Sequence, residues 1–130
     1  MVLRDIFKTN ESYKRALCLH PIALAIMMEM FLYCYERDLP FIVTDTVTTL
    51  KEDSDLGRVS STHRTGRAFD IRNRQDAWDF WAVQRFENHF NEKFRDYGAK
   101  NKEGMSKLVV SIPHGTGPHF HVQIDRIYSR

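Results

Sequence analysis

The chain has 130 residues, of which 42% are hydrophobic and 28% charged, with a formal net charge of +2. This length and composition suit one globular domain, 1–130, in which 1–11 would form a loose N-terminal arm. The basic residues are dispersed, which argues against nucleic acid as a partner. The longest apolar stretch, 22–28, is too short to cross a bilayer, so we expect no membrane insertion.

The first half of the chain predicts one helix and two strands. Apolar residues nearly encircle the segment 21–37, which indicates a buried helix that ends before Pro40. A short apolar run at 41–44 predicts a buried strand, and the polar segment 51–62 predicts an exposed loop. A second strand is expected at 67–71.

The segment 75–97 has the clearest helical periodicity in the chain. An aromatic stripe is expected to face the core, with His89 beside it at the surface. The stripe comprises Trp78, Trp81, Ala82, Phe86, Phe90 and Phe94. Two further strands are expected at 108–112 and 120–124. The whole pattern predicts an α+β fold, a small antiparallel sheet flanked by helices.

The sequence contains two cysteines, Cys18 and Cys34. If one helix holds both, they lie about 24 Å apart, which is too far for a disulfide. We therefore expect two buried free thiols.

Five residues in the segment 61–70 combine metal-ligand chemistry with a turn: Ser61, His63, Gly66, Ala68 and Asp70. Gly66 permits a backbone turn, and the alternation that begins at Ala68 predicts a strand with Asp70 on one face. Imidazole and carboxylate are both good zinc ligands, and a catalytic zinc site typically takes three protein ligands.

A second cluster, His119 and His121, lies near the C-terminus. On a strand these two residues share one face with Gln123, and the apolar residues between them share the other face. The apolar face belongs to the core, so the histidines are expected to point together toward a cleft. The two clusters together can supply a zinc ligand set.

The pattern Ser-x-His-x-x-Gly-x-Ala-x-Asp at 61–70 resembles the motif of the zinc D-Ala-D-Ala carboxypeptidase family, with all five fixed positions matched. That family includes vancomycin-resistance dipeptidases and phage L-Ala-D-Glu endolysins, and the hedgehog signalling domain shares its fold. In order and spacing the resemblance covers 20–125. It implies a hedgehog-like zinc fold in which His63 and Asp70 bind Zn²⁺, together with a histidine on a later strand.

Two registers compete for that third ligand. The segment 118–120 resembles the Pro-His-aromatic segment of the endolysins, which would make His119 the ligand. The segment 119–122 resembles the His-x-His pattern of the hedgehog domain and the secreted carboxypeptidases, in which the second histidine binds the metal. We favour His121 as the ligand and assign His119 a catalytic role beside it, but the first register stays open.

The acidic general base of the family is missing. It usually stands three residues before the third ligand, where this chain has Thr116 or Pro118, depending on the register. His114 is the nearest titratable residue and therefore the candidate base, because imidazole titrates near neutral pH.

The substrate-binding arginine of the family is also missing from the expected stretch, 44–49. Arg58, Arg64 and Arg67 are candidates to replace it. The loss of both groups is compatible with a variant mechanism or with an inactive protein that keeps its zinc.

These features predict a zinc metallopeptidase that hydrolyses a peptide bond in peptidoglycan stem peptides, as a carboxypeptidase or a phage-type endolysin does. The alternative is a catalytically inactive, zinc-stabilised binding module of the same fold. The N-terminal residues carry no signal-peptide pattern. We therefore expect a protein made in the cytoplasm that acts at the bacterial cell wall after release, as a phage-encoded enzyme would. We also expect a monomer.

Overall fold

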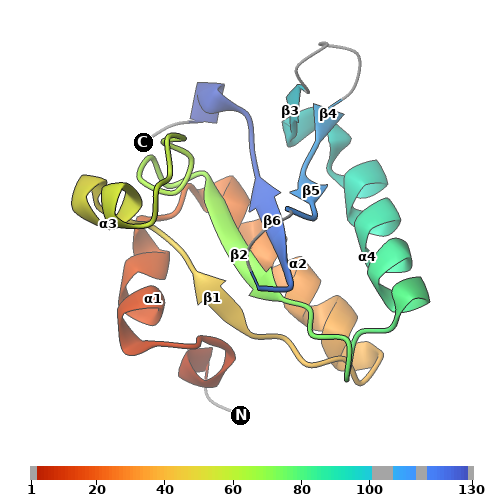
Figure 1. Ribbon diagram of the computed structural model, residues 1–130. Coiled ribbons are helices and arrows are strands. Elements are labelled where there is room, and N and C mark those ends of the chain that lie inside the picture. Colours follow the sequence, from red (N-terminus) through yellow and green to blue (C-terminus); the bar gives the residue numbers. More distant parts are fainter. Residues whose placement is uncertain (1–2, 101–106, 114–116, 129–130) are drawn as a thin grey trace.

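The computed structural model describes residues 3–100, 107–113 and 117–128, and it has an α+β architecture built on a small antiparallel sheet. The sheet has the strand order β1-β2-β6-β5, and β3 pairs with β4 in a separate ribbon (Figure 1). The strands are β1 (Val43–Asp45), β2 (Ala68–Arg72), β3 (Ala99–Lys100), β4 (Lys107–Leu108), β5 (Val110–Ser111) and β6 (His119–Gln123). The α-helices are α1 (Asn10–Arg15), α2 (Pro21–Glu36), α3 (Leu50–Asp55) and α4 (Phe80–Lys93), and short 3-10 helices cover 3–6, 16–18, 95–97 and 126–128. The expected α+β class, with a small antiparallel sheet and helices, is therefore confirmed.

Helix α2 forms where the apolar pattern predicts it. Pro21 occupies the first turn, where its missing N–H costs nothing, and the Nδ1 atom of His20 accepts a hydrogen bond from the backbone N–H of Ile22 at 3.1 Å. Six of its residues are buried, which matches the expectation of a central helix.

Helix α4 begins later than predicted. Its N-cap is Asp79, whose carboxylate accepts a hydrogen bond from the backbone N–H of Ala82 at 2.7 Å. The segment 75–78 is a turn, and from it Trp78 packs into the core. Trp81, in contrast, is 66% exposed, so its place in the buried stripe was wrong. His89 is exposed, as expected.

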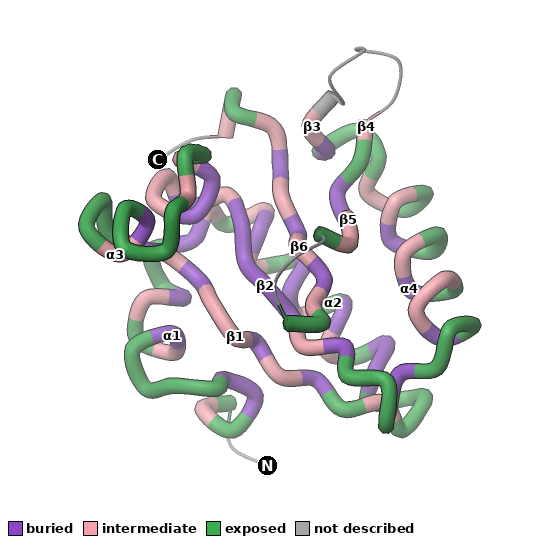
Figure 2. The backbone as a smooth tube through the Cα atoms, in the orientation of Figure 1, coloured by how far each residue is buried: buried purple, intermediate pink, exposed green. Residues whose placement is uncertain are grey.

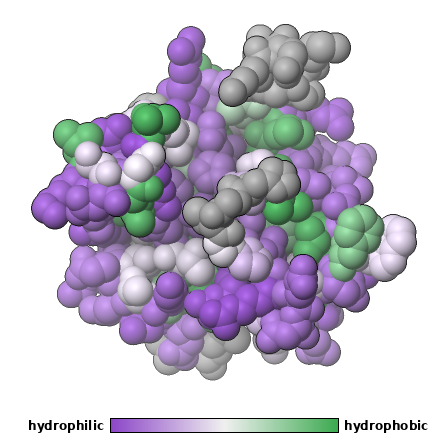
Figure 3. Space-filling model, in the orientation of Figure 1, coloured by the Kyte–Doolittle hydropathy of each residue, from purple (hydrophilic) through white to green (hydrophobic). Residues whose placement is uncertain are grey.

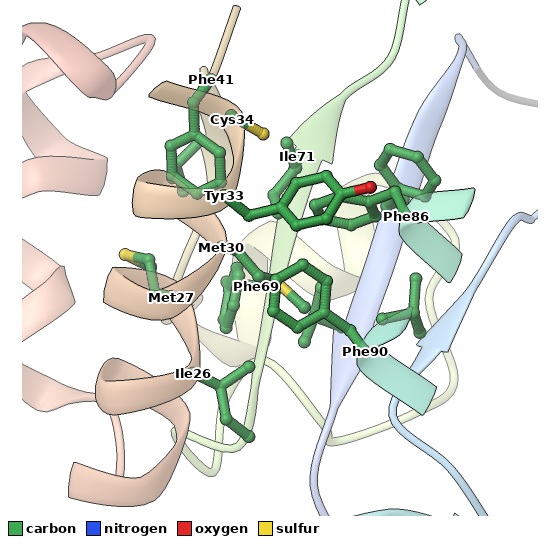
Figure 4. Packing of buried hydrophobic residues seen from close by; sticks show 14 of the residues in the cluster. Ile26, Met27, Met30, Tyr33, Cys34, Phe41, Phe69, Ile71, Phe86 and Phe90 are labelled. Atoms are coloured by element: carbon green, nitrogen blue, oxygen red, sulfur yellow. The ribbon is translucent and has the colours of Figure 1, made fainter. Parts of the chain in front are cut away.

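The core lies between the sheet and the helices α2 and α4 (Figure 4). From α2, the ring of Tyr33 contacts Phe86 and Phe90 of α4, with ring centroids 5.5 and 5.2 Å apart. From the sheet, the ring of Phe120 packs on that of Phe86, with the ring centroids 4.5 Å apart. Phe69 and Ile71 of β2 are fully buried in the same cluster. One face of the sheet is therefore committed to the core.

The N-terminal segment is packed against the sheet rather than loose. Ile6 and Phe7 are only 3% and 4% exposed, and Phe7 forms a parallel bridge with Val43. The hydroxyl of Thr46 donates a hydrogen bond to the backbone oxygen of Ser12 at 2.9 Å. The prediction of a loose arm fails for the described part of that segment, because its few apolar residues fill the space beside β1.

The segment expected to be an exposed loop contains α3. A reciprocal capping box starts this helix: the Thr49 hydroxyl accepts from the Glu52 N–H, and the Glu52 carboxylate accepts from the Thr49 N–H. Asp53 is buried at 1% exposure. Both cysteines are free, but Cys18 is exposed and precedes α2, so only Cys34 is the buried thiol that was expected.

Within the described ranges, no helix is long and apolar enough to cross a membrane.

Candidate metal centre

His63 lies in a turn between α3 and β2 that Gly66 shapes. Gly66 has a φ of +73°, a conformation that favours glycine, and its N–H donates to the backbone oxygen of His63 at 3.2 Å. Its own oxygen accepts a hydrogen bond from the N–H of His20 at 2.7 Å. The turn therefore packs against the start of α2. Its backbone approaches so closely that a Cβ atom at Gly66 would lie only 2.6 Å from the backbone oxygen of Cys18.

Asp70 and the C-terminal histidines are brought together by the pairing of β2 with β6. In this antiparallel pair Asp70 lies opposite His121, and Arg72 lies opposite His119. Along β6, buried and half-buried residues alternate (Figure 2), so both histidines face away from the core. The alternation in the sequence predicted this face correctly.

Three of the predicted ligands converge. The Oδ1 atom of Asp70 lies 3.4 Å from Nε2 of His63 and 3.0 Å from Nδ1 of His121. One donor atom from each of the three residues lies within 4.8 Å of the other two. Their side chains are 4%, 6% and 20% exposed, in the order His63, Asp70 and His121. His119 is not part of this group, which favours the register in which His121 is the third ligand.

The hydrogen bonds around the two rings aim lone pairs at Asp70. Nδ1 of His63 lies 2.7 Å from the backbone oxygen of Thr46, and Nε2 of His121 lies 2.9 Å from Oε1 of Gln123. An oxygen of this kind can only accept, so these nitrogens carry the hydrogens. In the neutral rings the nitrogens that face Asp70 are therefore acceptors, and they stand against an anionic acceptor.

A metal ion or a proton relieves this repulsion, and the spacing suits a metal. Tetrahedral zinc with ligand distances near 2.0–2.1 Å separates its ligand atoms by about 3.3 Å. The separations of 3.4 and 3.0 Å around Oδ1 of Asp70 are close to that value. Two imidazole nitrogens and a carboxylate oxygen are also a donor set that zinc accepts.

The contacts between Asp70 and the two histidines also shift the pKa values of His63 and Asp70. Burial opposes protonation of His63, but the hydrogen bond and the charge of Asp70 outweigh it, so the pKa of His63 lies above its usual value. Burial would raise the pKa of Asp70, but its interactions with His121 and His63 hold that pKa well below the usual range. Asp70 is therefore an anion at neutral pH, as a metal ligand must be.

Arg58 joins the centre to two other carboxylates. Its guanidinium lies 2.9 Å from Asp45, 3.6 Å from Asp53 and 3.6 Å from Oδ2 of Asp70. Its contact is thus with Oδ2 of Asp70, whereas the two histidines contact Oδ1. Asp53 is also held by Arg64 at 2.8 Å. Sequence reasoning named Arg58 as one of three candidates, but nothing in the sequence revealed its three partners.

The centre opens into a cleft of about 700 Å³ on the sheet face opposite the core. Figure 3 shows that hydrophilic residues dominate this face, while hydrophobic ones gather over α3 and on the opposite side toward α4. His119 lines the cleft, and its Nδ1 lies 2.7 Å from the backbone oxygen of Gly117. His119 therefore shares the cleft with His63, Asp70 and His121 but does not belong to the group that could hold a metal ion.

The other predicted site residues have different positions. Arg58 lines the cleft, but Arg64 and Arg67 do not. Arg67 instead donates to the backbone oxygen of Ile124 at 3.2 Å. The predicted base, His114, lies outside the described residues.

Sequence reasoning missed several residues of the cleft wall. Asp45, Arg72, Arg74 and Lys8 all line it. The position of Arg72 could have been inferred, because it stands two residues after Asp70 and therefore on the same face of β2. Lys8 and Asp45 line the cleft because of tertiary packing, which no pattern in the sequence predicts.

No protein-family model matches this chain, and no curated protein or solved structure matches it. The function is therefore inferred from the residues of the centre and the cleft.

Proposed function

We propose that this protein is a zinc-dependent peptidase that hydrolyses a bond in peptidoglycan stem peptides at the bacterial cell wall. The observation that carries the proposal is the group His63, Asp70 and His121, which lies in an open cleft. The motif at 61–70 supports it, because the two motif residues with ligand chemistry are the ones that meet the C-terminal histidine.

His63, Asp70 and His121 would hold the zinc. When bound, zinc lowers the pKa of a coordinated water toward 7 and polarises the scissile carbonyl. The ring nitrogens that face away from Asp70 are held by hydrogen bonds: Thr46 orients the ring of His63, and Gln123 orients the ring of His121. Such outer contacts set the ring tautomer and raise the affinity for the metal.

His119 is suited to move a proton within the cleft. Its Nδ1 donates to the backbone oxygen of Gly117, so in the neutral ring Nε2 is the atom that accepts a proton. It lies on the same face of β6 as His121, two residues away. In this role it takes the proton released when water attacks and passes it to the leaving amine. His114 remains a second candidate for the same step, on sequence grounds.

A zinc-stabilised binding module is the second candidate function. The specific observation in its favour is the missing carboxylate, since Thr116 and Pro118 occupy the positions at which a base would stand. Asp45, a carboxylate that does line the cleft, is already bound to Arg58 at 2.9 Å.

Digestion of purified sacculi distinguishes the two. Zinc-loaded protein is incubated with sacculi of several cell-wall chemotypes, and the released muropeptides are identified by mass. The proposed activity predicts stem-peptide fragments whose masses identify one bond. His63→Ala should release none, whereas His89→Ala, which removes an exposed histidine from α4, should match the wild type. Stoichiometric zinc without release from any chemotype would favour the binding module.

A further inference from the structure

Three cations on the cleft wall have no acidic partner among the residues that the structure describes. Lys8, Arg72 and Arg74 all line the cleft. In the part of the chain that the structure describes, none of them lies within 4.0 Å of a carboxylate oxygen. Arg58, the other arginine of the cleft, is in contrast surrounded by three carboxylates. The unpaired cations are therefore a separate feature from the network around the metal ligands.

The backbone beneath the two arginines is held firmly. The N–H of Arg72 donates to the oxygen of Ile42 at 3.0 Å, and the residue is paired with His119 across the sheet. The backbone oxygen of Arg74 accepts from the N–H of Trp78 at 2.8 Å, and Trp78 is 1% exposed. These contacts fix the backbone of the two arginines that line the cleft.

The chemistry of this group favours a carboxylate. A guanidinium presents a planar fork of donors that matches a carboxylate in a bidentate pair. Asp76 shares a smaller hollow with Arg72 and Arg74, yet no ion pair within 4.0 Å joins these three described residues. Positive charges without a partner in a concave wall also concentrate anions near the site.

The spacing relates the cations to the metal centre. Arg72 is two residues beyond Asp70 on β2, a displacement of about 7 Å along the strand. An extended peptide covers the same length in two residues. A carboxylate bound by Arg72 and Arg74 would therefore belong to a residue within about two positions of the bond at the metal centre.

We propose that Lys8, Arg72 and Arg74 form a subsite for a substrate carboxylate close to the scissile bond. The substrate class is then an acidic peptide, bound through a free C-terminal carboxylate or through the α-carboxylate of a γ-linked D-Glu. The proposal rests on the proposed function, since the subsite serves the same cleft.

Binding to the metal-free protein tests the subsite without relying on catalysis. The probe is the synthetic stem peptide L-Ala-D-Glu-L-Lys-D-Ala-D-Ala, titrated by calorimetry at low salt. Two neutralised forms, one with a C-terminal amide and one with D-isoglutamine in place of D-Glu, distinguish the two carboxylates. One of them should bind about 10- to 100-fold more weakly than the acid, the usual effect of losing a charged hydrogen bond.

Variants assign the effect to the cations. Arg72→Gln combined with Arg74→Gln should weaken the acid peptide about 10- to 100-fold and leave the discriminating neutral form unaffected. Lys8→Gln should have a smaller effect in the same direction. The matched control is Arg85→Gln, which removes one exposed arginine from α4 outside the cleft. Circular dichroism verifies that each variant is folded.

The outcomes separate this inference from the proposed function. Equal affinity for the acid and both neutral forms, no measurable binding of any form, or an unchanged double variant would overturn the subsite, even if the zinc-loaded protein cleaves sacculi. Charge-dependent binding that the double variant abolishes would support the subsite, even if no wall peptide is cleaved and the proposed peptidase activity fails.

Discussion

Asp70 of β2 and His121 of β6 stand directly opposite each other, with 3.0 Å between Oδ1 and Nδ1. The pairing of the two strands therefore positions two of the three residues of the candidate metal centre. A slip of one residue in either strand would turn one of these side chains toward the core. Because Phe69 and Ile71 alternate with Asp70 and are fully buried, the core itself locks the register that the site requires.

Removing a ligand should abolish tight zinc binding. His63→Ala and Asp70→Asn each leave two of three donors, so we expect the purified variants to lose most of the one zinc per chain that the wild type should hold. Metal content is measured by atomic emission. In the wild type, free zinc at 100 times its Kd should stabilise the fold by about 2.7 kcal/mol. His89→Ala serves as the control, and full zinc retention in both ligand variants would contradict the site.

The two histidines of β6 should separate metal binding from turnover. His121→Ala should lose zinc and activity together. His119→Ala should keep zinc and lose about 10- to 100-fold in turnover, because its ring lines the cleft outside the ligand group. Zinc content and muropeptide release are measured on the same preparations. If His119→Ala lost the metal and His121→Ala kept it, the register would be the endolysin-like one.

A buried carboxylate should make one ion pair of the α3 region important for stability. Asp53 is 1% exposed and is held by Arg64 at 2.8 Å and by the hydroxyl of Thr48 at 2.6 Å. Arg64→Gln leaves this charge with fewer partners, so we expect the free energy of unfolding to fall by about 1–3 kcal/mol.

Urea unfolding measures that change. The control is Lys51→Gln, which breaks the exposed pair of Lys51 with Asp55 in α3 and should cost no more than about 0.5 kcal/mol. Equal effects of the two substitutions would show that Arg58 and the hydroxyl of Thr48 are sufficient partners for Asp53.

The parts of the fold that depend on local patterns could be predicted from the sequence. The alternation in 119–124 and at Phe69 to Ile71 placed Asp70 and His121 on the cleft face, because a strand has a fixed period of two. The spacing of Thr49 and Glu52 also matches a capping box and could have predicted the start of α3. The helix was missed because its mostly polar residues form no apolar stripe.

The remaining features depend on contacts between distant segments. The strand order places β6 between β2 and β5, and no local pattern encodes that choice. The same is true of Arg58, which meets Asp45 and Asp70 only after folding. Trp81 has the spacing of a core residue relative to Trp78, yet within α4 it lies on the same face as the exposed Arg85 and Asn88 and is itself exposed.

The two cysteines should differ sharply in reactivity. Burial raises the pKa of the Cys34 thiol to about 12, despite the nearby charge of Arg37, whereas Cys18 is exposed. Because the thiolate is the reactive form, iodoacetamide at pH 8 should modify Cys18 and spare Cys34 in the folded protein. Peptide mass mapping shows which thiol reacts. In 8 M urea both should react, and Cys18→Ser should leave the folded protein unmodified. Rapid modification of Cys34 would mean that α2 opens readily.

Gly66 and Gly57 offer a matched pair for testing the turn that carries His63. Both have positive φ, +73° and +72°, so an alanine at either position adds a backbone strain of about 1–2 kcal/mol. A Cβ at Gly57 meets nothing within 4 Å, but one at Gly66 would lie 2.6 Å from the backbone oxygen of Cys18. Gly66→Ala must therefore push the turn away from the start of α2, at a further cost of about 1–3 kcal/mol. Since that movement shifts His63, zinc affinity should fall in Gly66→Ala and not in Gly57→Ala. Chemical denaturation of the metal-free variants and zinc titration measure the two effects, and identical behaviour of the pair would mean that the turn does not position the ligand.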